Sequence, residues 1–144
     1  MNEIVCSGAL IYSLDTHRFL FLHRSNGKRN TNVWGLVGGT NEETETPWEG
    51  LKREIEEEIG PIDIKKTIPL ETFVSNDTKF RFHTYLCIVK NEFLPKLNKE
   101  HDGFAWCSFS KWPKPLHYGL TNTLNKKVNL NKLKTVFEVI DLIN

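Results

Sequence analysis

Apolar and polar residues alternate along several short stretches of the chain, which is typical of β-strands with one buried face. The pattern predicts strands over 3–13, 18–24, 66–74, 79–90 and 103–109. In KFRFHTYLCIVK (79–90), one parity carries Phe80, Phe82, Leu86 and Ile88. Between the strands, 26–32 (NGKRNTN) reads as a loop, and 33–39 (VWGLVGG) is a short apolar run that ends in two glycines.

Two further stretches have apolar residues at helical spacing. Over 47–59, where Pro47 suits a first helical turn, a narrow stripe is formed by Trp48, Leu51, Ile55 and Ile59. Near the C-terminus the repeat comprises Leu133, Val136, Phe137, Ile140 and Ile143. Strands mixed with two helices predict a layered α/β (α+β) fold, and the length of 144 residues suits one domain over 1–144.

The helix at 47–59 concentrates acidic side chains beside its buried stripe. Glu54, Glu57 and Glu58 follow the i, i+3, i+4 spacing that places them on one face, while Glu56 points elsewhere, toward solvent. Like charges at this spacing repel, by roughly 0.2–0.5 kcal/mol per pair. From charge alone the face could be an ordinary solvated one, but converging carboxylates also suit hard divalent cations.

Two neighbouring features favour the cation site. Arg53 lies one turn before Glu57 and could hold a carboxylate by a charged hydrogen bond. Gly38 and Gly39 precede the helix by a loop and allow the backbone to turn sharply or to approach a ligand closely.

Composition and charge exclude several classes of protein. The net charge is only +1, yet 41–58 hold eight glutamates against Lys52 and Arg53, whereas 103–137 hold six lysines and no acidic residue. The three widely spaced cysteines suggest neither a disulfide framework nor a structural zinc site. No apolar run approaches the ~20 residues of a membrane span, and the N-terminal stretch lacks a basic leader region, so we expect a cytoplasmic protein.

The stretch GTNEETETPWEGLKREIEEEIG (39–60) resembles the signature of the Nudix hydrolases. That signature is glycine, five residues, glutamate, seven residues, Arg-Glu, an apolar residue, any residue, Glu-Glu, any residue, glycine and an apolar residue. The matching positions are Gly39, Glu45, Arg53, Glu54, Ile55, Glu57, Glu58 and Gly60. Pro61 replaces the last apolar residue, and Val37 stands where relatives often have a proline before the glycine pair.

The resemblance implies a mixed β-sheet between α-helices and a hydrolase that cleaves a nucleoside diphosphate linked to another group, using Mg²⁺ or Mn²⁺. Water activated by the metal would attack a phosphorus, with Glu57 or Glu54 accepting its proton. The implied metal ligands are Gly38 (by its carbonyl), Glu54, Glu57 and Glu58. Arg53 would support catalysis from the signature helix, and it would brace the loop together with Gly39 and Glu45.

Two candidates lie outside the signature. Arg24 ends a strand (FLFLHR) that carries a basic residue in many relatives, and it could bind a phosphate oxygen or be an ordinary strand-edge arginine. Glu100 could complete a metal site or act as a base, or it could be an exposed loop acid. The histidines are interpreted as structural or exposed and none is assigned to catalysis, and the aromatic residues Trp34, Phe104, Trp106 and Trp112 are interpreted as packing residues.

Several alternatives remain within this hypothesis. The substrate could be a nucleoside triphosphate, a dinucleoside polyphosphate, a nucleotide sugar or, as the one form of nucleic acid, a capped or 5′-phosphorylated RNA end. A homodimer is possible. The competing functions are a catalytically silent Nudix-fold binding or regulatory module, and an RNA-associated protein whose lysines at 111–134 follow a phosphate backbone.

Overall fold

The computed structural model describes residues 3–25 and 31–143, with the backbone alone for 141–143. Its strands are β1 (Ile4–Ser13), β2 (Arg18–Arg24), β3 (Val33–Gly35), β4 (Val37–Thr40), β5 (Lys66–Val74), β6 (Phe80–Val89) and β7 (His101–Ser108). Its helices are α1 (Pro47–Ile59), α2 (Tyr118–Asn125) and α3 (Lys127–Ile143).

The strands form one mixed sheet, in which β1 is central. Along the sheet the order is β3-β2-β1-β6-β5, while β4 pairs with the first half of β1 and β7 pairs with β2. β1 runs parallel to β6, and the other pairs are antiparallel. Because β2 and β4 share one edge of β1, the glycine-containing strand β4 lies beside the residues that begin β1.

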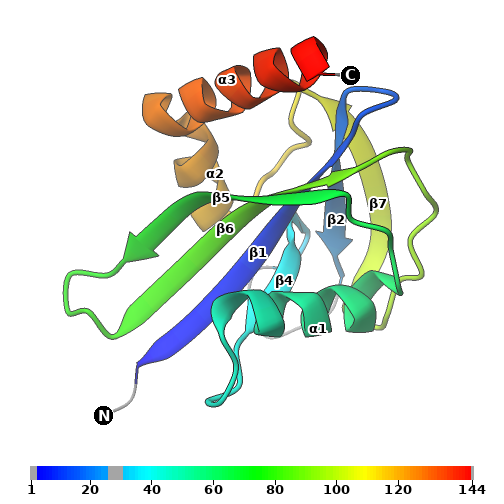
Figure 1. The fold of residues 1–144 in the computed structure, drawn as a ribbon. Coiled ribbons are helices and arrows are strands. Elements are labelled where there is room, and N and C mark those ends of the chain that lie inside the picture. Colours follow the sequence, from blue (N-terminus) through cyan, green and yellow to red (C-terminus); the bar gives the residue numbers. More distant parts are fainter. Residues whose placement is uncertain (1–2, 26–30, 144) are drawn as a thin grey trace.

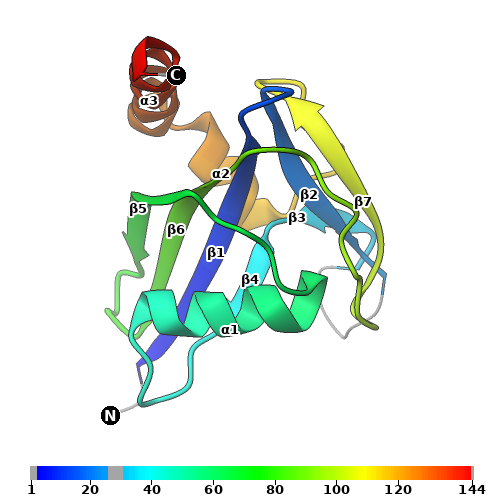
Figure 2. The ribbon, with the colours of Figure 1, turned by 45° about the vertical axis from the view of Figure 1, so that its right-hand side comes forward.

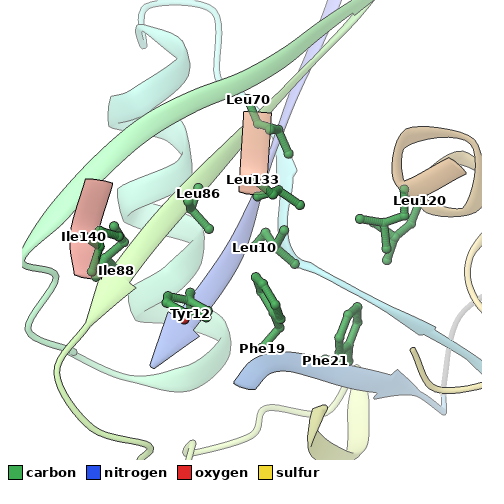
Figure 3. Packing of buried hydrophobic residues seen from close by; sticks show 11 residues of the cluster. Leu10, Tyr12, Phe19, Phe21, Leu70, Leu86, Ile88, Leu120, Leu133 and Ile140 are labelled. Atoms are coloured by element: carbon green, nitrogen blue, oxygen red, sulfur yellow. The ribbon is translucent and has the colours of Figure 1, made fainter. Parts of the chain in front are cut away.

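Helices cover both faces of this sheet. α1 lies across one face, and α2 and α3 lie over the other (Figures 1 and 2). Alternation along β1 separates two cores: Ala9 and Ile11 pack with α1, while Leu10 and Tyr12 pack with α2 and α3. Figure 3 shows the second core, where Leu120 of α2 and helix α3 face side chains of β1, β2 and β6. The predicted mixed sheet between helices is confirmed.

Most of the predicted elements agree with the structure, and the differences are local. The apolar run at 33–39 forms two short strands, because Leu36 separates β3 from β4. β7 begins at His101, two residues before the predicted strand. Helix α2 was not predicted, because its eight residues are too few for a helical repeat to be visible. Of the predicted loop at 26–32, residues 26–30 lie outside the described residues, as does the side chain of Ile143.

The described helices include none that is both long enough and apolar enough to cross a membrane. The cysteines Cys6, Cys87 and Cys107 are all free thiols, and Cys87 is buried.

Candidate active site

Helix α1 is fixed in place at its start and along one stripe. The Thr46 hydroxyl accepts a hydrogen bond from the Glu49 N–H at 3.2 Å, and the Glu49 carboxylate accepts one from the Thr46 N–H at 2.9 Å, which forms a capping box. The predicted stripe is confirmed, since Leu51, Ile55 and Ile59 are buried and Trp48 packs against the same core. This packing sets the rotation of the helix and turns its glutamates toward β4.

Two of those glutamates lie against the glycine pair of β4. Glu58 is almost wholly buried, and its Oε1 accepts a hydrogen bond from the Gly38 N–H at 3.0 Å. The Glu54 carboxylate lies so close to Gly39 that a Cβ atom at Gly39 would come within 2.5 Å of its Oε2. The absence of a side chain at Gly39 therefore makes room for Glu54.

Glu54, Glu57 and Glu58 form an acidic cluster on α1. Arg53 connects the exposed side of this acidic cluster to the loop before α1. Its guanidinium donates two hydrogen bonds to Glu45, at 2.7 and 3.0 Å, and one to the Thr40 carbonyl at 3.2 Å. The Nη1 group also lies 3.0 Å from Glu54 and 3.2 Å from Glu57. The hydrogen bond to Glu45 is the main cause that raises the pKa of Arg53 above its ordinary value, so the guanidinium remains charged.

Burial and neighbouring negative charges disfavour the ionised forms of Glu54 and Glu58. Burial raises the pKa of Glu58 to about 8 against the opposing hydrogen bond from Gly38, and the charges of Glu54 and Glu100 add to the increase. Burial also raises the pKa of Glu54, although Arg53 opposes this. Among the described residues, Glu58 has no basic partner, so a cation would relieve a repulsion that Arg53 leaves in place.

The donor set fits a hard divalent cation, although the described residues hold no preformed cage of three acidic, histidine or cysteine ligands. The oxygens of Glu54 and Glu58 lie beside the backbone of Gly38 and Gly39. The Glu57 side chain is 54% exposed and is held outward by Arg53, which accounts for the open arrangement. Carboxylate and carbonyl oxygens are the ligands that Mg²⁺ and Mn²⁺ prefer.

The two candidates outside the signature occupy different surroundings. Arg24 ends β2 at a register shift and lines a cavity of about 840 Å³ between α2 and the sheet. Glu100 is exposed just before β7, and its carboxylate makes no hydrogen bond or ion pair with the described residues. Its charge nevertheless contributes to the raised pKa of Glu58.

The cavity also contains residues that the sequence interpretation had set aside as structural. His101, in β7, is 7% exposed, and its Nδ1 has no partner among the described residues. His117 caps α2 by accepting the Gly119 N–H at Nδ1, at 3.1 Å. Burial, followed by the charge of Arg24, lowers the pKa of both histidines, so neutral imidazoles and a charged guanidinium share this part of the cavity.

Comparison with known proteins places this arrangement in a family. A family model for the NUDIX domain matches residues 5–125. The chain belongs to the Nudix family. It is similar to the dihydroneopterin triphosphate diphosphatase of Haemophilus influenzae, with 34% identity over 118 residues that cover 71% of this chain and 72% of the relative. The chain is accordingly an enzyme, a Nudix hydrolase that cleaves a diphosphate linkage in a nucleotide derivative.

Solved Nudix structures share the fold. A Nudix hydrolase from M. smegmatis superposes with a TM-score of 0.70 at 16% identity, over 96% of this chain and 87% of that one. A C. elegans Ap4A hydrolase superposes with a TM-score of 0.68 at 23% identity, over 92% and 98%. At these identities the likeness shows the fold alone. Nudix hydrolases generally use divalent metal ions, which agrees with the acidic cluster on α1.

Proposed function

We propose that Glu54, Glu57 and Glu58, with the carbonyl of Gly38, hold Mg²⁺ or Mn²⁺ and that the enzyme hydrolyses a triphosphate ester between its phosphorus atoms. The observation that carries the proposal is the buried Glu58, which lies against Gly38 and Glu54 without a basic partner among the described residues. A carboxylate in this position is costly to a folded protein unless a cation binds there.

The protein's own groups supply the other parts of the reaction. A divalent cation, when bound, neutralises phosphate oxygens and makes water more acidic. Glu57, the most exposed of the three carboxylates, accepts the proton of the attacking water, and Glu54 is the second candidate for this role. The water oxygen bonds to phosphorus as the bridging P–O bond breaks, and the phosphate chain leaves.

Arg53 and Arg24 have different roles in this scheme. Arg53 is a positioning residue, because it holds Glu57 and Glu54 while it is itself fixed by Glu45. Arg24 lines the cavity and is suited to bind a phosphate oxygen of the substrate. Glu100, in the loop before β7, contributes negative charge and a further ligand atom in this scheme.

A triphosphate is proposed as the substrate class because the similar H. influenzae protein is named a dihydroneopterin triphosphate diphosphatase. The three free cysteines agree with a reducing compartment, so we place the enzyme in the cytoplasm.

The test is an assay of purified protein with nucleoside triphosphates, dihydroneopterin triphosphate, dinucleoside polyphosphates, nucleotide sugars and capped RNA. Each is incubated with Mg²⁺, with Mn²⁺ and with chelator, and the products are identified by ³¹P NMR. We expect metal-dependent release of diphosphate from a triphosphate. Cleavage of a nucleotide sugar, a dinucleoside polyphosphate or capped RNA alone would contradict the substrate class, and failure on the whole panel by a folded sample would contradict the proposed function.

A further inference from the structure

Gly50 lies in the interior of α1, and the side-chain amide of Asn41 rests on it. A Cβ atom at Gly50 would be 2.5 Å from both Cγ and Oδ1 of Asn41 and 2.7 Å from its Nδ2. Glycine inside a helix is less stable than alanine, so this close approach is the physical reason for a glycine here. Gly50 is buried, and its lack of a side chain makes room for the Asn41 amide.

Asn41 also joins the sheet to the start of α1. It follows the last residue of β4, and its backbone N–H donates to the Val5 carbonyl of β1 at 2.7 Å. Its Nδ2 donates to the Thr46 carbonyl at 2.8 Å, and the same carbonyl accepts a hydrogen bond from the Gly50 N–H at 3.0 Å. A single side chain therefore contacts the end of β4, the N-cap of α1 and the second turn of the helix.

Ser7 reaches the same point from β1. It is 1% exposed, and its hydroxyl lies within donating distance of Asn41 Oδ1, at 3.2 Å, and of the Pro47 carbonyl, at 3.1 Å. The strand register pairs Ser7 with Gly39, against which the Glu54 carboxylate lies. The Ser7 hydroxyl thus connects the strand pair beside the acidic cluster to the first turn of α1.

These contacts differ from those of Arg53. Arg53 binds Glu45 of the loop and the Thr40 carbonyl from the exposed side of the acidic cluster. Asn41 and Ser7 act at the other side of the helix, where α1 faces β1. They therefore fix the helix on the sheet, which the pairing of Arg53 with Glu45 does not do.

The position of Gly50 determines the position of two carboxylates. An α-helix rises 1.5 Å per residue, so Glu54 lies roughly 6 Å and Glu58 roughly 12 Å along the axis from Gly50. Glu58 Oε1 is 3.0 Å from the Gly38 N–H, and Glu54 fits against Gly39 with no space for a methyl group. A shift of α1 on the sheet would move both carboxylates relative to these glycines.

We propose that Asn41 and Ser7 are positioning residues for the hydrolysis, because their hydrogen bonds and the contact of Asn41 with Gly50 fix α1 on β1. The inference rests on the proposed function in that Glu54 and Glu58 bind the divalent cation. Loosening this contact is expected to lower cation affinity and turnover in a protein that remains folded.

The experiment begins with Asn41→Ala and Ser7→Ala. Mn²⁺ affinity is measured by electron paramagnetic resonance, kcat and KM for the best triphosphate at saturating Mn²⁺, and Tm by circular dichroism. We expect Asn41→Ala to weaken Mn²⁺ binding by roughly 3- to 30-fold and to lower kcat by roughly 10- to 100-fold, with little change in KM. Ser7→Ala, which removes one hydroxyl, should have a smaller effect in the same direction.

Gly50→Ala disturbs the same contact from the helix. Its methyl group would displace the Asn41 amide, so Mn²⁺ binding should weaken although alanine is the better helix former. In the double variant Asn41→Ala/Gly50→Ala, the methyl group occupies space that the amide has left. This variant should regain Tm relative to Asn41→Ala but not Mn²⁺ affinity, which separates the placement of the helix from its stability.

The matched control is Asn129→Ala. Asn129 is 1% exposed, and its Nδ2 donates to the Thr123 carbonyl at 2.9 Å, a bond of the same kind between α2 and α3. Its loss should lower Tm at least as much as Asn41→Ala does, and it should leave Mn²⁺ affinity unchanged.

Three results would overturn the proposal. These are wild-type Mn²⁺ affinity in both Asn41→Ala and Gly50→Ala, an equal loss of Mn²⁺ affinity in Asn129→Ala, and a double variant that regains Mn²⁺ affinity together with Tm. Each of them leaves the proposed function standing as long as the wild type binds Mn²⁺. A wild type that binds no Mn²⁺ would instead refute the proposed function, and the positioning role with it.

Discussion

At the scale of single residues, the acidic cluster is arranged by its neighbours more than by its own contacts. Glu58 is covered by the α1 core and held by one backbone N–H, while Glu54 fits only because Gly39 has no side chain. Arg53 then neutralises the outer side of the cluster but does not reach Glu58. A buried carboxylate without a basic partner among the described residues lowers the stability of the fold, and a cation bound as proposed would offset this cost.

The close approach of Glu54 to Gly39 gives a direct prediction. Gly39→Ala would place its Cβ 2.5 Å from Glu54 Oε2, so the carboxylate must move. We expect turnover to fall at least tenfold and Mn²⁺ affinity to fall with it, as measured by steady-state kinetics and calorimetry. Gly103→Ala serves as the control, because its Cβ would meet nothing closer than His23 Cβ at 3.6 Å. Equal activity of the two variants would contradict the role assigned to Gly39.

The surroundings of a residue can be predicted from the sequence only where its neighbours in space are also close to it in the chain. The spacing of Glu54, Glu57 and Glu58 fixes a common helix face, so the cluster was predictable from the signature alone. Thr84 has the same parity as Phe82, which was a visible signal that a polar group faces the apolar side of β6. That it borders a cavity depends on the pairing of β6 with β1 and β5 and on the position of α2, and these long-range contacts are not visible in the sequence.

At the scale of elements, α2 lines one side of the cavity and is hydrogen-bonded to Glu71 of β5. Glu71 accepts hydrogen bonds from the Thr123 hydroxyl at 2.9 Å and from Lys126 at 2.6 Å. Burial alone would raise the pKa of Glu71, but the hydrogen bonds from Lys126, Asn129 and Thr123 outweigh it and hold the pKa below its ordinary value. The carboxylate therefore stabilises the fold only in its ionised form.

This pairing predicts a pH-dependent contribution to stability. Because the pKa of Glu71 is lower in the folded protein than its unfolded value of 4.5, the ionised carboxylate stabilises the folded protein at pH values above 4.5. This stabilisation is lost as the pH falls through the pKa that Glu71 has in the folded protein. Glu71→Gln should lower the free energy of unfolding by about 1 kcal/mol at pH 7, since the partly exposed pair is screened by solvent.

Urea unfolding of the wild type and Glu71→Gln between pH 7 and pH 3 measures this effect. The difference between the two proteins should narrow as the pH falls below 4.5. The exposed Glu56→Gln in α1 should differ little from the wild type throughout. A gap that stays constant down to pH 3 would show that the Glu71 charge does not hold α2 in place.

At the scale of the whole molecule, the sheet joins two sites that lie on different elements. Helix α1, which carries the glutamates, covers one face of the sheet, and α2 covers the other (Figures 1 and 2). The cavity is lined by residues of α2 and of the sheet. The glycine pair of β4 borders both, since Gly38 and Gly39 contact the glutamates and also line the cavity. Under the proposed function, a phosphate chain at these glycines would reach the glutamates of α1 while the rest of the substrate occupies the cavity.

The measurement that tests this account most directly compares Glu57→Gln with Glu56→Gln, a matched pair of adjacent glutamates that are both exposed. Turnover of the best triphosphate and Mn²⁺ binding by electron paramagnetic resonance are measured on both variants and on the wild type, with circular dichroism to confirm folding. We predict that Glu57→Gln lowers kcat by roughly 10²- to 10⁴-fold and weakens Mn²⁺ binding in a folded protein, while Glu56→Gln behaves as the wild type. Full metal-dependent turnover in Glu57→Gln would contradict the assignment of the catalytic centre to this face of α1.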